Sequence, residues 1–154
     1  MSQPLDPDLR SLPDDLSDPR LYLNRELSLV AFQKRVLAQA CDSSVPLLER
    51  LRFLAIVSDI VDEFFEVRVA GLKQGVSLGL GPQGPDRAPP EVVLRKVREQ
   101  MLSLVEEQYQ ELNAVVLPAL ATEGIRVWRR SELSQKQNAW LGDYFDEHCR
   151  PVLT

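Results

Sequence analysis

The sequence predicts a mainly α-helical fold: a three-helix bundle with a long central helix, followed by a short strand and a terminal helix. Two observations lead to this fold class. Apolar residues recur every three or four positions over three long stretches, which is the spacing of helices with a buried face. A short link and a stretch rich in proline and glycine separate these helices, and a brief alternation of apolar and polar residues follows them.

The composition fits one domain, or one domain and part of a second. Of the 154 residues 44% are apolar and 27% are charged, so the chain can bury a core and is neither disordered nor membrane-spanning. We therefore expect a cytoplasmic protein. The net charge of −5 argues against general binding to nucleic acid or anionic membranes. The two cysteines, Cys41 and Cys149, lack the spacing of a disulfide framework or a metal site.

The beginning of the chain is predicted to be a leader followed by the first helix. Residues 1–20 combine four prolines with several aspartates and serines, which predicts a disordered leader. The first helix is predicted to follow Ser28, because serine is a favourable N-cap residue. Its apolar face is predicted to contain Leu29, Phe32, Val36, Leu37 and Ala40.

The second helix is predicted from Pro46 to about Gln74, since proline suits the first turn of a helix. Apolar residues cover more than half of its circumference, so we expect it to be the central helix. Arg68 lies between two apolar stripes. We expect its guanidinium to join the helices through a carboxylate, with Glu26 or Glu49 as candidates, because a buried unpaired charge is unfavourable. Alternatively, Arg68 points at phosphates or at an adjoining domain.

A loop and a third helix follow the central helix. Residues 75–90 hold four of the seven glycines and four of the eleven prolines, which predicts a mobile loop. The third helix is predicted to begin near Glu91. Pro118 should kink or end it, because proline cannot donate a backbone hydrogen bond.

The organisation of the sequence changes at Gly124, which is a favourable helix stop. Residues 125–128 alternate as in a short strand. Ser134 and Gln137 have the spacing of a capping box and predict the start of the terminal helix. Since a lone strand is not stable by itself, it either packs on the bundle or pairs with strands beyond Thr154.

Three segments resemble the N-terminal helical domain of type-1 polyphosphate kinases. They read NRELS at residues 24–28, PLLERLRFLAI at residues 46–56 and DEFFEVRVAGL at residues 62–72. The resemblance implies a helical N domain over residues 21–123. It also implies that residues 124–154 are the truncated start of a head domain, where the predicted strand would find its sheet.

The resemblance implies a full-length enzyme that transfers the terminal phosphate of ATP reversibly to polyphosphate, with Mg²⁺. Its expected partners are ATP, polyphosphate and the head and C-terminal domains of the same chain, and it is expected to be a homo-oligomer. The family's catalytic and metal-binding residues belong to the C-terminal domains. We therefore expect no catalysis and no metal site in this chain alone, and a structural role for His148.

The resemblance assigns one wall of the adenine pocket to the N domain, through an Asn that precedes Asp-Glu-Phe. Here residues 58–62 read SDIVD, and Ile60 occupies the position of that Asn. An amide can donate and accept hydrogen bonds at a base edge, whereas Ile offers van der Waals contact only. The candidate nucleotide-binding residues are therefore Asp59 and Ser58, or Ile60 through packing.

An acidic face accompanies these residues on the same helix. Asp62 and Glu63 have the spacing of a solvated helix face, and we expect a structural or interdomain role for them, as for Arg68. This face also supports a hypothesis of another class. The chain would then be a non-catalytic helical module that presents its acidic face to a partner protein.

Overall fold

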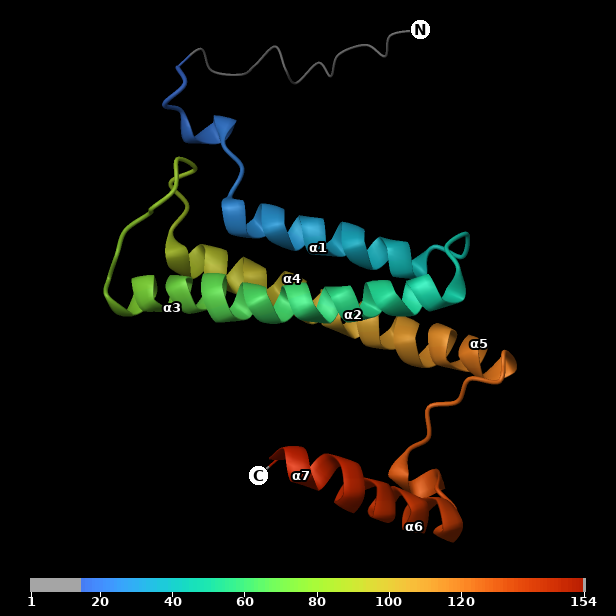
Figure 1. The fold of residues 1–154 in the computed structure, drawn as a ribbon. Coiled ribbons are helices and arrows are strands. Elements are labelled where there is room, and N and C mark those ends of the chain that lie inside the picture. The colour runs from blue at the N-terminus through green and yellow to red at the C-terminus, as the bar shows by residue number, and fades with distance from the viewer. Residues whose placement is uncertain (1–14, 154) are drawn as a thin grey trace, which may run out of the picture. The chain divides into compact units, whose positions relative to one another are not determined.

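The computed structural model describes residues 15–153, which form helices and connecting loops without a β-strand in that range (Figure 1). The chain divides into two compact units, a first unit that ends at Val116 and a second unit that begins at Leu117. The prediction of a mainly helical fold is confirmed. Residues 1–14, most of the predicted disordered leader, lie outside the described residues.

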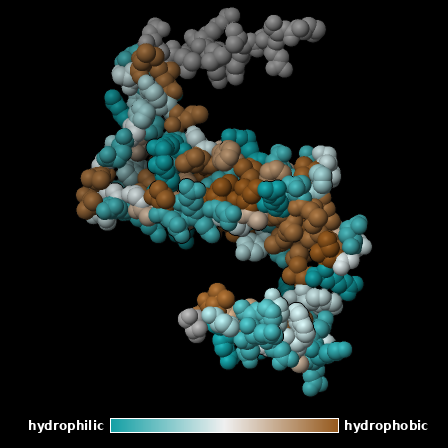
Figure 2. Space-filling model, in the orientation of Figure 1, coloured by the Kyte–Doolittle hydropathy of each residue, from teal (hydrophilic) through white to brown (hydrophobic). Residues whose placement is uncertain are grey.

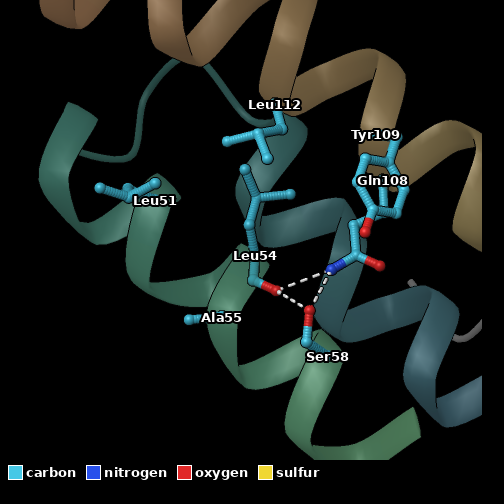
Figure 3. Close-up of a pocket in the computed structure, with 7 residues that line it drawn as sticks. All are labelled: Leu51, Leu54, Ala55, Ser58, Gln108, Tyr109 and Leu112. Carbon is cyan, nitrogen blue, oxygen red and sulfur yellow. Dashed lines mark hydrogen bonds between the residues drawn. The ribbon is translucent and has the colours of Figure 1, made fainter. Parts of the chain in front are cut away.

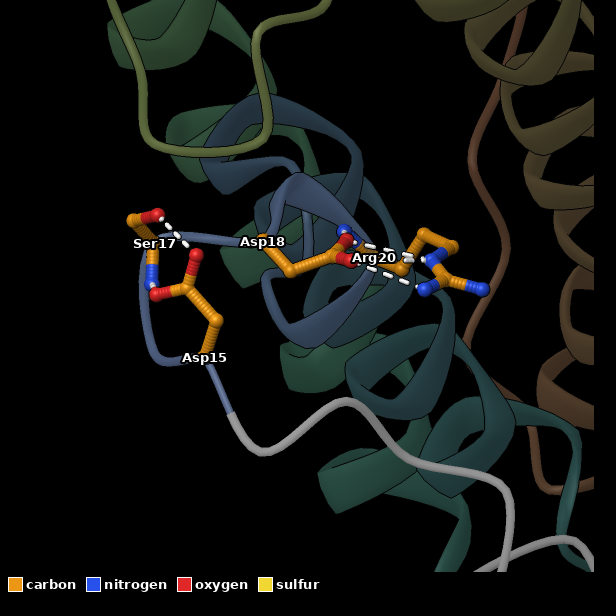
Figure 4. A network of polar contacts seen from close by, with 4 residues as sticks. All are labelled: Asp15, Ser17, Asp18 and Arg20. Carbon is orange, nitrogen blue, oxygen red and sulfur yellow. Dashed lines mark hydrogen bonds and ion pairs between the residues drawn. The ribbon is translucent and has the colours of Figure 1, made fainter.

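A turn and the short 3₁₀-helix η2 (Pro19–Leu21) precede the first long helix. Asp18 accepts a hydrogen bond from the backbone N–H of Arg20 at 2.9 Å and pairs with its guanidinium at 2.8 Å (Figure 4). The side chain of Arg20 thereby lowers the pKa of Asp18. The backbone N–H and hydroxyl of Ser17 lower the pKa of Asp15 in the same way. These exposed bonds fix a local turn.

Helix α1 (Arg25–Cys41) begins at a different cap from the one predicted. Asn24 is the N-cap, and its Oδ1 accepts a hydrogen bond from the backbone N–H of Leu27 at 3.1 Å. Ser28 lies inside the first turn, where its hydroxyl donates to the carbonyl of Asn24 at 2.8 Å. The prediction that Ser28 caps this helix is therefore wrong.

The buried face of α1 is rotated from the predicted one. Phe32, predicted to lie in the core, is 47% exposed. The sequence prediction placed Gln33 outside the stripe, but this side chain is only 4% exposed. The buried residues of the helix are Val30, Gln33, Leu37 and Ala40.

The predicted central helix is one run of three helical segments, α2 (Leu47–Glu63), the π-helical η3 (Phe64–Val69) and α3 (Ala70–Ser77). It begins where Pro46 predicted and ends slightly beyond the predicted end. Gly79, with φ of +64°, terminates it. A residue in the left-handed region lets the following N–H, that of Leu80, donate to the carbonyl of Gly75 at 2.9 Å.

The connecting residues 78–89 lead into helix α4 (Pro90–Glu111), which is followed by the π-helical η4 (Leu112–Val116). A hydrogen bond joins this loop to the start of α1: Asn24 Nδ2 donates to Asp86 Oδ2 at 2.9 Å. The loop predicted as mobile is therefore tied to the bundle at one point.

The core of the first unit lies among α1, α2, η3 and α4. Helix α1 packs against both α2 and α4, and α3 packs against α4 (Figure 1). The sequence predicted that the second helix is central. Helix α1 also contacts both of the other long helices, α2 and α4, so α2 does not hold the central position alone. Figure 2 shows apolar residues among hydrophilic ones on the visible face. The buried apolar residues are Val30, Leu37, Ala40, Leu54, Val57, Val61, Phe64, Val69, Val93, Val97, Met101, Leu104 and Val116.

Arg50 joins these helices through polar contacts. Its Nε donates to the carbonyl of Ala40 at 2.7 Å, and its guanidinium pairs with Glu111 at 2.5 Å. The residue is only 9% exposed. One buried guanidinium therefore connects α1, α2 and α4, and its charge has a carboxylate partner, as burial requires.

The second unit contains helix α5 (Leu117–Thr122) and an irregular connection. Gly124, with φ of +83°, ends α5, and the N–H of Ile125 donates to the carbonyl of Leu120 at 2.9 Å. The predicted helix stop is thus confirmed. The predicted strand over residues 125–128 is wrong: the described residues contain no second strand to complete its backbone hydrogen bonds.

The rest of the second unit is helical. A short η5 (Arg130–Glu132) precedes α6 (Gln135–Tyr144), the π-helical η6 (Phe145–Cys149) and α7 (Arg150–Leu153). Ser134 and Gln137 form the predicted capping box at the start of α6. Among residues 15–153, no helix combines the length and apolar character needed to cross a membrane.

Candidate functional site

A groove with a volume of about 260 Å³ lies between α1 and the consecutive segments α2 and η3. We call it the α1–α2 groove. Most of its lining is apolar, and three of its side chains carry polar groups. The lining residues are Leu29, Phe32, Gln33, Ile60, Glu63, Phe64, Val67 and Arg68. A mainly apolar hollow with a few polar groups is the usual form of a small-molecule site.

Ile60 is half-buried in this groove. Its side chain can offer apolar contact only. Its backbone carbonyl accepts a hydrogen bond from Nε2 of Gln33 at 3.1 Å. An amide group is therefore present beside Ile60, and it comes from the neighbouring helix α1.

Gln33 is a buried polar residue that the sequence analysis missed. The side-chain Oε1 is fully buried and has no hydrogen-bond partner among the described residues. Such unpartnered buried acceptors are uncommon in folded proteins. The sequence held one signal for this residue, since Gln33 follows Val30 and precedes Leu37 at helical spacing.

Arg68 is half-buried and lines the α1–α2 groove. It also lines an adjoining hollow of about 470 Å³, to which Glu26 contributes. Within residues 15–153 its guanidinium makes no hydrogen bond or ion pair. Glu49, the other candidate partner of Arg68, pairs with Arg52 instead, with 3.8 Å between Oε2 of Glu49 and Nη1 of Arg52. In the described structure the buried interhelix pair belongs to Arg50 instead.

Ser58 faces a different hollow, of about 220 Å³, between α2 and α4 (Figure 3). Its Oγ accepts a hydrogen bond from Nε2 of Gln108 at 2.8 Å, and the same nitrogen donates to the carbonyl of Leu54 at 2.9 Å. Asp59 and Asp62 are exposed and line neither hollow. The structure thus brings Ile60, Glu63 and Arg68 together, and leaves Ser58, Asp59 and Asp62 apart from them.

Several titratable side chains lie outside the groove. Within residues 15–153, no group of three His, Cys, Asp or Glu side chains could hold a metal ion. Burial, and then the charge of Glu111, raises the pKa of Cys41, which makes this thiol less reactive. The ring of His148 stacks on Tyr144, with the ring centroids 4.5 Å apart.

The family described as "Polyphosphate kinase N-terminal domain" matches residues 22–128. The chain belongs to this family. The resemblance inferred from the three sequence segments is thereby confirmed. The match contains the whole α1–α2 groove.

Several polyphosphate kinases are similar to this chain over almost all of its length. The "Polyphosphate kinase" of Thermosynechococcus vestitus is 48% identical over 142 residues, which are 92% of this chain and 19% of that protein. The protein of the same name from Xylella fastidiosa is 46% identical over 154 residues, 99% of this chain and 22% of that protein. The chain therefore spans about a fifth of the length of these polyphosphate kinases.

A solved structure confirms the fold of this polyphosphate kinase N-terminal domain. It is the crystal structure of polyphosphate kinase from Porphyromonas gingivalis, with a TM-score of 0.68 and 28% sequence identity. The similarity covers 84% of this chain and 18% of that one.

Proposed function

We propose that this chain is the N-terminal module of an ATP–polyphosphate phosphotransferase, which transfers the terminal phosphate of ATP reversibly to polyphosphate. The observation that carries the proposal is the family match over residues 22–128, within relatives named polyphosphate kinase. In the full-length enzyme the module forms one wall of the adenine pocket and contacts the remaining domains. It does not catalyse the reaction alone.

The α1–α2 groove is our candidate for the adenine wall. It contains Ile60, which occupies the position that the resemblance assigns to the adenine-binding Asn of the polyphosphate kinases. Phe32 and Phe64 line the same groove, and aromatic and aliphatic side chains suit the faces of a purine. The neighbouring Asp59, and Ser58 after a change of rotamer, remain the alternative polar contacts to the nucleotide.

The charged residues near the groove are candidates for contacts with the phosphates or with other domains. The guanidinium of Arg68, which has no partner among residues 15–153, suits an anion, since arginine binds phosphates and carboxylates through paired N–H groups. Asp62 and Glu63 are exposed and suit a basic partner surface. We propose interdomain roles for these three residues, with the N domain over residues 21–123 and the head domain from residue 124 onward.

Magnesium, which the phosphoryl transfer implies, does not fit the described residues of this chain. Asp62, Glu63 and Glu66 all come from one helical run, and Mg²⁺ needs near-octahedral oxygen ligands. Other domains of the longer protein would have to supply that site. We also propose a homo-oligomeric enzyme in the cytoplasm, where the free thiols of Cys41 and Cys149 are expected to persist.

The test is ATP-dependent polyphosphate synthesis by the full-length protein, wild type beside Ile60→Asn. We expect the wild type to be active. We expect Ile60→Asn chiefly to lower the KM for ATP, by about tenfold, because one added hydrogen bond in a preformed site contributes about that much. Inactivity of the wild type with every nucleotide donor would contradict the proposal and favour the non-catalytic interaction module.

A further inference from the structure

We infer that Gln33 determines which base the α1–α2 groove accepts: its Oε1 receives a hydrogen bond from an amino group on the nucleotide base. The inference rests on the proposed function and adds to it a residue from α1. Gln33 lines the groove, is 4% exposed and carries an acceptor without a partner among residues 15–153.

The orientation of the amide group decides what Gln33 can recognise. Its Nε2 already donates to the carbonyl of Ile60 at 3.1 Å. A flipped amide would place Oε1 against that carbonyl oxygen, and two acceptors repel each other. The bond to Ile60 therefore holds Oε1 as the free end, and Gln33 offers the groove a hydrogen-bond acceptor.

An acceptor of fixed position distinguishes purines by the group at carbon 6. Adenine carries an amino group there, which donates to Oε1. Hypoxanthine and guanine carry a carbonyl oxygen there, which leaves both acceptors unpaired. Sites built to form such a bond reject analogues that lack the donor far more strongly than sites that rely on shape alone. The groove should therefore prefer adenine.

Access to Oε1 requires a movement of the lining, because this atom is covered in the structure. Phe32 lies beside Gln33 in the chain, lines the groove and is 47% exposed, so it is the side chain that we expect to move. Ile60 then provides the apolar contact to the base. A longer amide from α1 thus takes the place of the amide that Ile60 lacks.

Gln108 provides a matched control within the same helical unit. It is 8% exposed, and its Nε2 donates to the α2 carbonyl of Leu54 at 2.9 Å, just as Gln33 donates to that of Ile60. Gln108 lies in the hollow between α2 and α4 (Figure 3) and does not line the α1–α2 groove. Replacing Gln33 removes one interhelix amide bond and replacing Gln108 removes two, but only Gln33 lines the groove proposed for the base.

The experiment measures kcat/KM for ATP and for inosine triphosphate, which carries the 6-oxo group, in polyphosphate synthesis by the full-length protein. The variants are Gln33→Met, which keeps the length of the side chain, and Gln108→Met. We expect the wild type to prefer ATP. We expect Gln33→Met to reduce this preference at least about tenfold, mainly through the KM for ATP, and Gln108→Met to retain it.

Three outcomes would overturn the inference. A Gln33→Met variant that keeps the wild-type preference for ATP would make Gln33 a link between α1 and α2 only. Both methionine variants losing the preference equally would show a general packing effect. A wild type without activity from any donor would overturn the proposed function itself. If Gln33→Met does not fold, Gln33→Asn takes its place in the experiment. We expect the shorter amide to lower the preference for ATP over inosine triphosphate, and an unchanged preference would contradict the inference.

Discussion

Arg50 is the residue that most directly joins the helices of the first unit. Its guanidinium reaches the carbonyl of Ala40 on α1 and the carboxylate of Glu111 on α4. Both side chains of the ion pair are largely shielded, with 11% and 14% of their surfaces exposed. Removing one partner therefore leaves a shielded charge without its counter-ion, which is the costly case.

We predict that Glu111→Ala lowers the free energy of unfolding by about 3 kcal/mol, the low end of the range for breaking a buried pair. Arg52→Ala is the control, since Arg52 and Glu49 form an exposed pair at 3.8 Å. It should cost about 0–1 kcal/mol. Urea unfolding of the three proteins measures both values. Equal losses in the two variants would contradict a structural role for Arg50.

The sequence predicted that an arginine joins the helices but selected Arg68. That selection assumed a uniform 100° per residue along the second helix. The π-helical segment η3 (Phe64–Val69) winds the chain less per residue, because its hydrogen bonds span five residues instead of four. Side chains beyond Glu63 therefore depart from the directions that a uniform 100° per residue predicts.

Helix ends account for most of the agreement and disagreement at the scale of elements. Gly124 and the Ser134–Gln137 capping box were predictable, because each rests on local backbone chemistry. The start of α1 was not, because Asn24 and Ser28 are both good caps and lie one turn apart. Asn24 has a second contact, with Asp86, which is distant in the sequence.

We predict that Asn24→Ala destabilises the chain by about 1 kcal/mol or more, since it removes a helix cap and the bond to the loop at residues 78–89. Ser28→Ala removes a hydroxyl that bonds within the first turn and should cost at most about 0.5 kcal/mol. Thermal unfolding of both variants tests the cap assignment. A larger loss of stability for Ser28→Ala than for Asn24→Ala would contradict the assignment of Asn24 and favour Ser28 as the N-cap.

Helical structure includes Pro118, where the sequence predicts a kink or an end of the third helix. Proline lacks the N–H that would bond to the carbonyl four residues earlier. The π-helical η4 (Leu112–Val116) ends two residues before Pro118, and Pro118 itself lies in α5 (Leu117–Thr122). A local change of hydrogen-bond register therefore accommodates the missing donor.

At the scale of the whole molecule, the helical class and the family were predictable, whereas the strand was not. The family followed from motifs such as DEFFEVRVAGL at residues 62–72, which lie on one helical run. A strand, by contrast, depends on a partner at a distance, and residues 125–128 have none among the described residues. Gln33 was missed because its importance comes from a contact with Ile60 on another helix.

The central claim is that the α1–α2 groove of this chain forms one wall of the adenine pocket. It is tested most directly by photolabelling the full-length protein with 8-azido-ATP and mapping the labelled peptides by mass spectrometry. We predict label on the peptides that carry Phe32 and Ile60, and its loss in the presence of excess ATP. Labelling that excess ATP suppresses, but that lies entirely outside residues 22–128, would contradict the claim.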